Sequence, residues 1–303
     1  MRGLAKRTEE LIHFAYTQLA ESHPMTLRQL HYAIFSAAKI DYENTQADYK
    51  RLSRATTLAR RVQRWAELHG KQQVTDGIPH DWIIDELREA EMVSVWDNVA
   101  GYMDAVKQSY RRNNWQDQPN YCELWSEKAT ALGSMRPLTQ DLGVTLRACR
   151  GFGSTGMEGQ IGILFEAIKK PITIFYIGDH DPSGHDIERD IHQRAQQASG
   201  KGFRMVRLAI HAEDIKAFNL PPQRIKTTDT RARGFKVRFG VMAPTVELDA
   251  LPVDELRRRV RNAIEGLIDF EAWNRQVRAQ EVELRCIAEF AERVKTLPQL
   301  PQP

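Results

Sequence analysis

The segment Ile172-Thr173-Ile174-Phe175-Tyr176-Ile177, followed by Gly178 and then by Asp179-His180-Asp181-Pro182-Ser183-Gly184, decides the fold of this 303-residue chain. Six largely apolar residues with little alternation indicate a strand that is covered on both faces, as in a mostly parallel sheet. The proline and the glycine of the second hexapeptide end that strand. The pattern therefore predicts an α/β domain in which two carboxylates, Asp179 and Asp181, lie where a buried strand enters a turn.

The spacing of these two carboxylates suggests a metal site. Residues two apart in an extended chain point the same way, so Asp179 and Asp181 can converge on one ion. Ligands that are all oxygen favour Mg²⁺ or Mn²⁺ over zinc. The alternative is that both residues cap the helix that begins near Ser183, because Asp and Ser are common helix caps.

A second segment, upstream of the first, favours the metal interpretation. It runs from Asn120 to Ala129 as Asn-Tyr-Cys-Glu-Leu-Trp-Ser-Glu-Lys-Ala, an apolar-polar alternation that leads into a helical pattern. In an open α/β sheet, ligands gather outside the carboxyl ends of neighbouring strands, so Glu127 is expected to face the aspartate loop. Glu123 is a competing choice, since it lies earlier on the same strand.

A glutamate that ends one strand and an Asp-x-Asp that ends a later strand resemble the TOPRIM domain of topoisomerases, primases and related nucleases. Within that family, the Asp-His-Asp-Pro-Ser-Gly sequence looks most like the version in the topoisomerase VI A subunit and the meiotic double-strand-break transesterases. The resemblance implies that Glu127, Asp179 and Asp181 hold Mg²⁺ or Mn²⁺. Glu127 is preferred to Glu123 because Lys128 follows it, as in the Glu-Lys of some TOPRIM proteins.

The N-terminal part of the chain has a helical pattern. Apolar residues recur at helical spacing in residues 3–20, Thr26 is placed to cap a second helix, and a basic helix is expected from about Gln46 to Leu68. Short helices joined by turns, one of them strongly basic, resemble a helix-turn-helix or winged-helix module.

Proteins of the same family carry a winged-helix domain ahead of TOPRIM, with an Arg-Asp-x-Tyr-Tyr type motif whose last tyrosine attacks DNA. This chain has Arg28-Gln29-Leu30-His31-Tyr32 in the same relative place, with Gln29 and His31 as departures from the motif. The resemblance implies that Tyr32 is the nucleophile and that Arg28 or His31 assists the movement of charge and protons. The alternative is that Tyr32 is a packing residue. The metal would then activate water, and the protein would be a hydrolytic nuclease.

Positive charge is concentrated in two stretches, although the net charge is only +3. The first stretch has six cations and no acid, namely Lys50, Arg51, Arg54, Arg60, Arg61 and Arg64. The second, residues 201–240, has ten cations against three acids and includes Lys226 and Arg231. Such stretches predict salt-sensitive phosphate contacts without sequence preference; the alternative is a solvated helix face.

Two other motifs are weaker. Residues 150–156 are glycine-rich but lack the Gly-Lys-Ser/Thr ending of a P-loop, so they are interpreted as a structural turn. No other ATP site is visible, and strand passage driven by ATP would need a separate ATPase subunit. The acidic pair Glu247 and Asp249 is interpreted as preceding a helix start rather than as surrounding the metal.

Composition bounds the setting of the protein. The sequence has no run of eighteen apolar residues and no signal-peptide pattern, so we expect no membrane span and a cytoplasmic, nucleoid-associated protein. The three cysteines, Cys122, Cys149 and Cys286, form no Cys-x-x-Cys pair and suit a reducing compartment.

These patterns predict a helical winged-helix-like DNA-binding module in residues 1–115, a TOPRIM-like metal-binding α/β domain in residues 116–250 and a helical tail in residues 251–303. The expected function is Mg²⁺-dependent DNA strand cleavage, by tyrosine transesterification or by hydrolysis. A second copy of the chain is a candidate partner, because a double-strand cut with one tyrosine per chain requires a two-fold dimer. The alternative is a non-catalytic DNA-binding or assembly subunit that keeps the TOPRIM scaffold.

Overall fold

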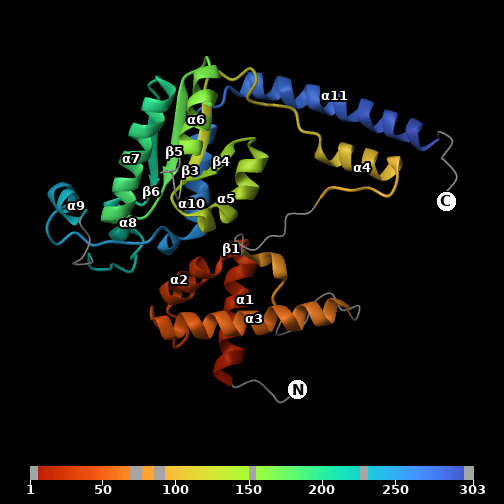
Figure 1. Ribbon diagram of the computed structural model, residues 1–303. Helices are drawn as coiled ribbons and strands as arrows, with labels where there is room; N and C mark the ends of the chain where they lie inside the picture. Colours follow the sequence, from red (N-terminus) through yellow and green to blue (C-terminus); the bar gives the residue numbers. More distant parts are fainter. Residues whose placement is uncertain (1–5, 69–76, 85–92, 150–154, 226–230, 297–303) are drawn as a thin grey trace. The chain divides into compact units, whose positions relative to one another are not determined.

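The computed structural model describes residues 6–68, 77–84, 93–149, 155–225 and 231–296 (Figure 1). The chain forms two compact units, one made of residues 1–88 and 122–266, the other of residues 89–121 and 267–303. These units group the chain differently from the three segments expected from the sequence, because residues 89–121 pack with the C-terminal residues. The architecture is α/β, as expected, with more helix than strand.

The first unit begins with three helices where the sequence predicted them. They are α1 (Lys6–Ser22), α2 (Leu27–Ala37) and α3 (Gln46–Leu68). Thr26 caps α2 as expected: its hydroxyl accepts a hydrogen bond from the Gln29 amide (3.1 Å), and the Gln29 side chain accepts one from the Thr26 amide (2.9 Å). This reciprocal capping box fixes the start of the helix that carries Arg28 and Tyr32.

A short β pairing accompanies these helices. Strand β1 (Met25–Thr26) runs parallel to β2 (Ile83–Ile84), which follows a 3₁₀ turn at His80–Trp82. Within residues 6–68 and 77–84 the structure therefore contains no antiparallel hairpin that would correspond to a wing.

The main sheet of the first unit has four strands in the order β4-β3-β5-β6. The strands are β3 (Tyr121–Ser126), β4 (Thr145–Ala148), β5 (Ile172–Ile177) and β6 (Arg204–Ala209). Strand β3 is parallel to β4, and β5 is parallel to β6. All six residues of β5 are buried, which confirms the strand covered on both faces that the apolar run predicted.

Helices connect and cover these strands (Figure 1). They are α5 (Ala129–Asp141), α6 (Thr155–Ala167), α7 (Pro182–Ser199), α8 (Ala212–Ala217), α9 (Ala232–Phe239) and α10 (Val253–Glu265), with a 3₁₀ turn η3 (Leu248–Ala250) before α10. One face of the core is aromatic: the rings of Trp125, Phe165 and Phe203 lie 5.3–6.3 Å apart, centre to centre.

The second unit is built on the long helix α11 (Phe270–Lys295) and the shorter α4 (Val99–Ser109). The Gln118 side chain accepts from the Asp269 amide (2.7 Å) and donates to the Asp269 carbonyl (3.0 Å), which fixes the chain before α11. Lys295, at the other end of α11, pairs with Asp104 of α4. Across both units, no helix in the described ranges is long and apolar enough to cross a membrane.

Candidate functional site

The aspartate loop after β5 is held by backbone hydrogen bonds on two sides. The Gly178 amide donates to the Ala209 carbonyl (2.9 Å), which continues the pairing of β5 with β6. On the other side, His180 and Val246 exchange two amide-to-carbonyl hydrogen bonds (2.8 and 3.0 Å). The second pair places Glu247, the next residue, beside the loop.

Arg207 of β6 also holds the aspartate loop in place. Its Nη1 donates to the carbonyls of Gly178 (2.9 Å) and Asp179 (3.3 Å), and its Nε donates to Glu188 of α7 (2.8 Å). Because the carbonyl oxygens of the loop face this guanidinium, the loop is fixed before any ligand binds.

The two aspartates of the loop have different partners. Asp181 caps α7, since its Oδ1 accepts from the Gly184 amide (2.6 Å) and Pro182 occupies the first helical turn. Asp179 does not cap this helix: its Oδ1 accepts from the Leu248 amide (2.7 Å) and pairs with Lys128 Nζ (2.9 Å). The capping alternative is therefore correct for Asp181 and wrong for Asp179.

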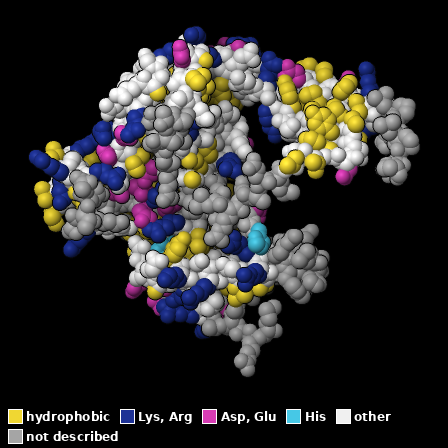
Figure 2. All heavy atoms as spheres, viewed as in Figure 1, with side chains coloured by type: hydrophobic (Ala, Val, Ile, Leu, Met, Phe, Trp, Pro, Cys, Tyr) yellow, Lys and Arg dark blue, Asp and Glu magenta, His cyan; other side chains and the backbone are white. Residues whose placement is uncertain are grey.

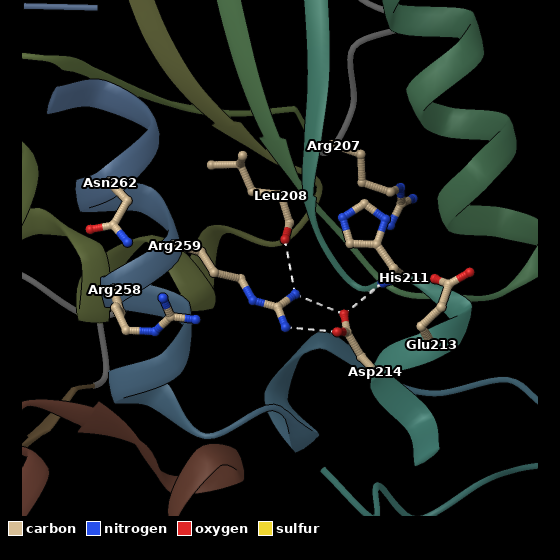
Figure 3. A pocket seen from close by; sticks show the side chains of 8 residues that line it. All are labelled: Arg207, Leu208, His211, Glu213, Asp214, Arg258, Arg259 and Asn262. Atoms are coloured by element: carbon tan, nitrogen blue, oxygen red, sulfur yellow. Dashed lines mark hydrogen bonds and ion pairs between the residues drawn. The ribbon is translucent and has the colours of Figure 1, made fainter. Parts of the chain in front are cut away.

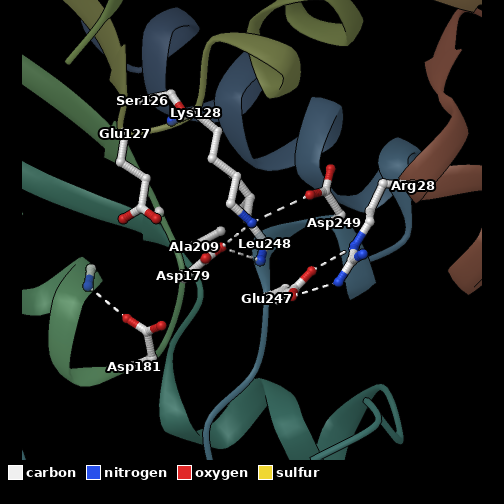
Figure 4. A network of polar contacts seen from close by, with 12 residues as sticks. Arg28, Ser126, Glu127, Lys128, Asp179, Asp181, Ala209, Glu247, Leu248 and Asp249 are labelled. Carbon is white, nitrogen blue, oxygen red and sulfur yellow. Dashed lines mark hydrogen bonds and ion pairs between the residues drawn. The ribbon is translucent and has the colours of Figure 1, made fainter. Parts of the chain in front are cut away.

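Glu127 follows β3 and approaches the same loop (Figure 4). Its Oε2 accepts a hydrogen bond from the Tyr176 hydroxyl (3.4 Å). A Cβ atom added at Gly178 or Gly184 would lie 3.0 or 2.9 Å from this oxygen, so both glycines leave the room that the carboxylate needs. Burial, and next the charge of Asp179, raise the pKa of Glu127 to about 8, with Asp181 acting in the same direction.

Glu123, the competing glutamate, has other partners. It is fully buried and accepts from Arg147 of β4 (2.9 and 3.1 Å) and from the indole of Trp125 (2.6 Å). The structure thus brings Glu127 together with Asp179 and Asp181, and it pairs Glu123 with a neighbouring strand.

Lys128 places a positive charge beside the candidate metal ligands. Its Nζ lies 2.9 Å from Asp179 and 3.4 Å from Asp249. Burial alone would lower the pKa of Lys128, but the carboxylates of Asp249 and Asp179 hold it above its ordinary value. Lys128 therefore carries a full positive charge inside the site, and it competes with any metal ion for Asp179.

The donor set suits a hard divalent cation, because it consists of three carboxylates, and burial together with the charges of the two aspartates raises the pKa of Glu127. As the side chains stand, however, no three His, Cys, Asp or Glu residues in the described part of the chain are grouped closely enough to hold an ion. The engagement of Asp179 with Lys128, and of Asp181 with α7, accounts for the separation. Metal binding would require Asp179 to exchange Lys128 for the ion.

Glu247 and Asp249 connect this site to the N-terminal helices (Figure 4). Glu247 accepts two hydrogen bonds from Arg28, at 2.7 and 2.6 Å, and one from the Tyr32 hydroxyl at 3.3 Å. Asp249 pairs with Lys128 and lies 3.5 Å from the Thr26 hydroxyl. The sequence interpretation of this acidic pair as a plain helix start missed both contacts.

Tyr32 is nearly inaccessible in this arrangement, with only 2% of its surface exposed. Burial, and next the negative charge of Glu247, raise its pKa to about 12. The guanidinium carbon of Arg28 lies 5.6 Å from the centre of the Tyr32 ring. The candidate nucleophile and the candidate metal ligands are therefore linked through one segment, since Tyr32 binds Glu247 and the amide of the next residue, Leu248, donates to Asp179.

His31 and Gln29, which depart from the expected motif, are bound internally. The two ring nitrogens of His31 lie 2.6 Å from the Tyr42 hydroxyl and 3.0 Å from Asn44 Oδ1. Gln29 completes the capping box and donates to the Ser134 hydroxyl (3.1 Å). With both ring nitrogens of His31 engaged, Arg28 is the better placed of the two candidate assistants of Tyr32.

The residues predicted to contact nucleic acid differ in solvent exposure and in whether they already bind other residues. Lys50, Arg54 and Arg61 of α3 are exposed, whereas Arg51 pairs with Asp48 (3.2 Å) and donates to the Asp41 carbonyl. Arg60 is half-buried, Arg231 is exposed, and Lys226 and the side chain of Arg64 lie outside the described residues. Figure 2 shows Lys and Arg side chains gathered low in the view, over the N-terminal helices.

A pocket of about 430 Å³, separate from the carboxylates described above, lies between β6, α8 and α10 (Figure 3). Its cations are already paired: Arg259 holds Asp214 at 2.7 and 2.8 Å, and both Arg258 and Arg259 pair with Glu255. Arg207 pairs with Glu188, so each arginine of the lining already has a carboxylate partner that a phosphate would have to displace.

No family model matches the sequence, and no curated protein matches it either.

Proposed function

We propose that the first unit contains a TOPRIM-like domain that cleaves DNA with a bound Mg²⁺ or Mn²⁺, as in the topoisomerase VI A subunits that the sequence resembles. The observation that supports the proposal is that Glu127 follows β3 and the loop of Asp179 and Asp181 follows the neighbouring strand β5, so that the charges of both aspartates act on Glu127. Burial, and next the negative charges of Asp179 and Asp181, raise the pKa of Glu127 to about 8, and a divalent cation would offset the repulsion among the three carboxylates.

Glu127, Asp179 and Asp181 would hold the ion, which when bound would withdraw electron density from a DNA phosphate. Arg207 and the glycines at 178 and 184 keep the loop and Glu127 in place for this task. Lys128, released from Asp179, would remain paired with Asp249 beside the phosphate.

The Arg28, Tyr32 and Glu247 cluster supports tyrosine transesterification. Glu247 is placed to accept the phenol proton as the Tyr32 oxygen bonds to phosphorus, and Arg28 is placed to stabilise the negative charge on that oxygen. The bond from phosphorus to the deoxyribose oxygen breaks, and that oxygen takes up a proton. The product is a phosphotyrosyl DNA end.

Hydrolysis is the second candidate, and the burial of Tyr32 favours it. A nucleophile that is 2% exposed and has a pKa of about 12 must first become accessible and then lose its proton. If Tyr32 stays packed, the same carboxylates would serve the attack of water on the phosphate.

Denaturing gel electrophoresis of protein incubated with labelled duplex DNA and Mn²⁺ separates the two routes. Transesterification predicts a covalent protein–DNA band that is lost in Tyr32→Phe and retained in Tyr102→Phe, which changes an exposed tyrosine of α4. Hydrolysis predicts equal cleavage by both variants with no covalent band. DNA binding without cleavage by any variant would favour a non-catalytic subunit.

A further inference from the structure

Helix α9 is attached to the aspartate loop by an aromatic cluster. The rings of Phe235 and Phe239 lie 5.1 and 4.8 Å from the ring of His180, the residue between the two loop aspartates. They lie 5.7 and 4.8 Å from His185 on α7. Phe235 is only 4% exposed. These contacts fix α9 on the loop that carries Asp179 and Asp181, so its outer face is a neighbour of the candidate site.

The outer face of α9 and the turn after it combine two kinds of side chain. Three large apolar residues are almost fully exposed: Val237 at 82%, Val241 at 72% and Met242 at 91%. The same segment carries Arg231, Arg233, Lys236 and Arg238, and no acid occurs from Arg231 to Val246. Figure 2 shows apolar side chains flanked by Lys and Arg at the left edge of the view, where Figure 1 places α9.

Exposed apolar side chains of this size are unfavourable in water unless a partner covers them. The surrounding cations select a partner with dense negative charge, and the attachment to the aspartate loop places that partner at the proposed cleavage site. Duplex DNA meets both conditions, since cations can hold its phosphates while apolar side chains enter between base pairs.

We propose that α9 and the following turn form a DNA wedge, in which Arg233, Lys236 and Arg238 bind phosphates and Val241 and Met242 insert at a base step. This inference rests on the proposed action on DNA and adds to it that the bound duplex is bent beside the cut. Insertion unstacks the step and bends the duplex, as apolar wedges do in other DNA-bending proteins. Bending widens access to the phosphate next to the aspartate loop.

The test is a duplex of about 30 base pairs with fluorescent donor and acceptor dyes at its two ends. Protein is added without divalent metal, so that the DNA stays intact. The parent protein is expected to raise energy transfer between the dyes. The double variant Val241→Ser/Met242→Ser is expected to lose that rise while its affinity stays within about threefold of the parent's, because phosphate contacts supply most of the affinity.

The matched control is Ile163→Ser, which removes an apolar residue of α6 that is 74% exposed. It is expected to bend DNA like the parent. The variant Arg233→Ala/Arg238→Ala is expected to bind more weakly and with a smaller dependence on salt.

Unchanged energy transfer on parent binding, or equal bending by parent and double variant, would overturn the wedge even if Mn²⁺-dependent cleavage persists. Bending without cleavage would instead contradict the proposed function and leave the wedge supported. Binding to vesicles that contain phosphatidylserine, lost in the double variant and accompanied by no DNA binding, would assign α9 to a membrane surface and overturn the proposal.

Discussion

The hydroxyl of Tyr32 donates a hydrogen bond of 3.3 Å to Glu247, 215 residues later in the chain. Glu247 also receives two hydrogen bonds from Arg28, and burial raises the pKa of Tyr32 to about 12 with the Glu247 charge acting in the same direction. The N-terminal helix α2 is thus joined to the segment that flanks the aspartate loop through the Glu247 carboxylate, in addition to the contact of Thr26 with Asp249. The contact of Tyr32 with Glu247 links the candidate nucleophile to the segment beside the candidate metal ligands.

Replacing Glu247 by Gln is expected to lower the pKa of Tyr32, because the negative charge that opposes ionisation is removed while the charge of Arg28 remains. Ultraviolet absorbance of tyrosinate up to pH 11 measures the change. The variant should gain a component that titrates below pH 11 and that disappears in Glu247→Gln/Tyr32→Phe. Identical titrations of parent and variant would show that Glu247 does not control the phenol.

The stability of the protein without divalent metal is expected to fall between pH 6 and pH 9. Glu127 has a pKa of about 8 in the folded state against 4.5 for an ordinary glutamate, so the folded state binds the additional proton between these values. The stabilisation is complete below pH 4.5 and is lost as the pH rises through 8. Between pH 6 and pH 9 the ionisation of Glu127 is expected to lower the free energy of unfolding by on the order of 2 kcal/mol.

Denaturant unfolding at pH 6 and at pH 9 checks this expectation. Glu127→Gln should show a smaller loss of unfolding free energy than the parent. A parent protein that is equally stable at both pH values, or a variant with the same pH dependence as the parent, would contradict the raised pKa of Glu127.

Replacing Lys128 by Met is expected to tighten Mn²⁺ binding, because the cation that competes for Asp179 is removed. A charge at this distance alters affinity by roughly tenfold or more when partly shielded from solvent. Isothermal titration with Mn²⁺ measures the effect, and Lys107→Met, on the exposed surface of α4, is the control. Weaker or unchanged binding by Lys128→Met would show that Lys128 does not occupy the metal position.

The basic helix α3 should contribute to DNA affinity through its exposed cations. Arg54→Ala/Arg61→Ala is expected to reduce the slope of log affinity against log salt by about two. Arg51→Ala should instead destabilise the fold, since Arg51 pairs with Asp48 and binds the Asp41 carbonyl. Titration of a fluorescent duplex at several salt concentrations measures this slope. If the double variant kept the parent's slope, α3 would not be a DNA-binding helix.

Local patterns in the sequence predicted the elements that carry the site. The apolar run 172–177 gave a buried strand, and Thr26 gave a helix cap, because each depends on residues that are close in the chain. The placement of Glu127 beside the aspartate loop follows from the general rule for strand ends in α/β sheets.

Contacts between distant segments escaped prediction. The partners of Glu247 lie more than 200 residues away, and nothing local distinguishes this glutamate from an ordinary helix start. The role of Lys128 was also missed, because its pairing with Asp179 and Asp249 depends on how three separate segments meet. The packing of residues 89–121 with the C-terminal helix α11 has no signal in either segment alone.

The central claim is that Glu127 and Asp179 hold a metal ion that DNA cleavage needs. The most direct measurement is the conversion of supercoiled plasmid to nicked or linear forms with Mg²⁺ or Mn²⁺. The proteins compared are the parent, Glu127→Gln, Asp179→Asn and the control Asp190→Asn. Asp190 is a suitable control because it pairs with Arg194 on α7. The account predicts metal-dependent cleavage by the parent and Asp190→Asn, and at least a hundredfold loss in the other two, as for residues that place a catalytic group. Cleavage by Glu127→Gln and Asp179→Asn at the parent's rate would contradict it.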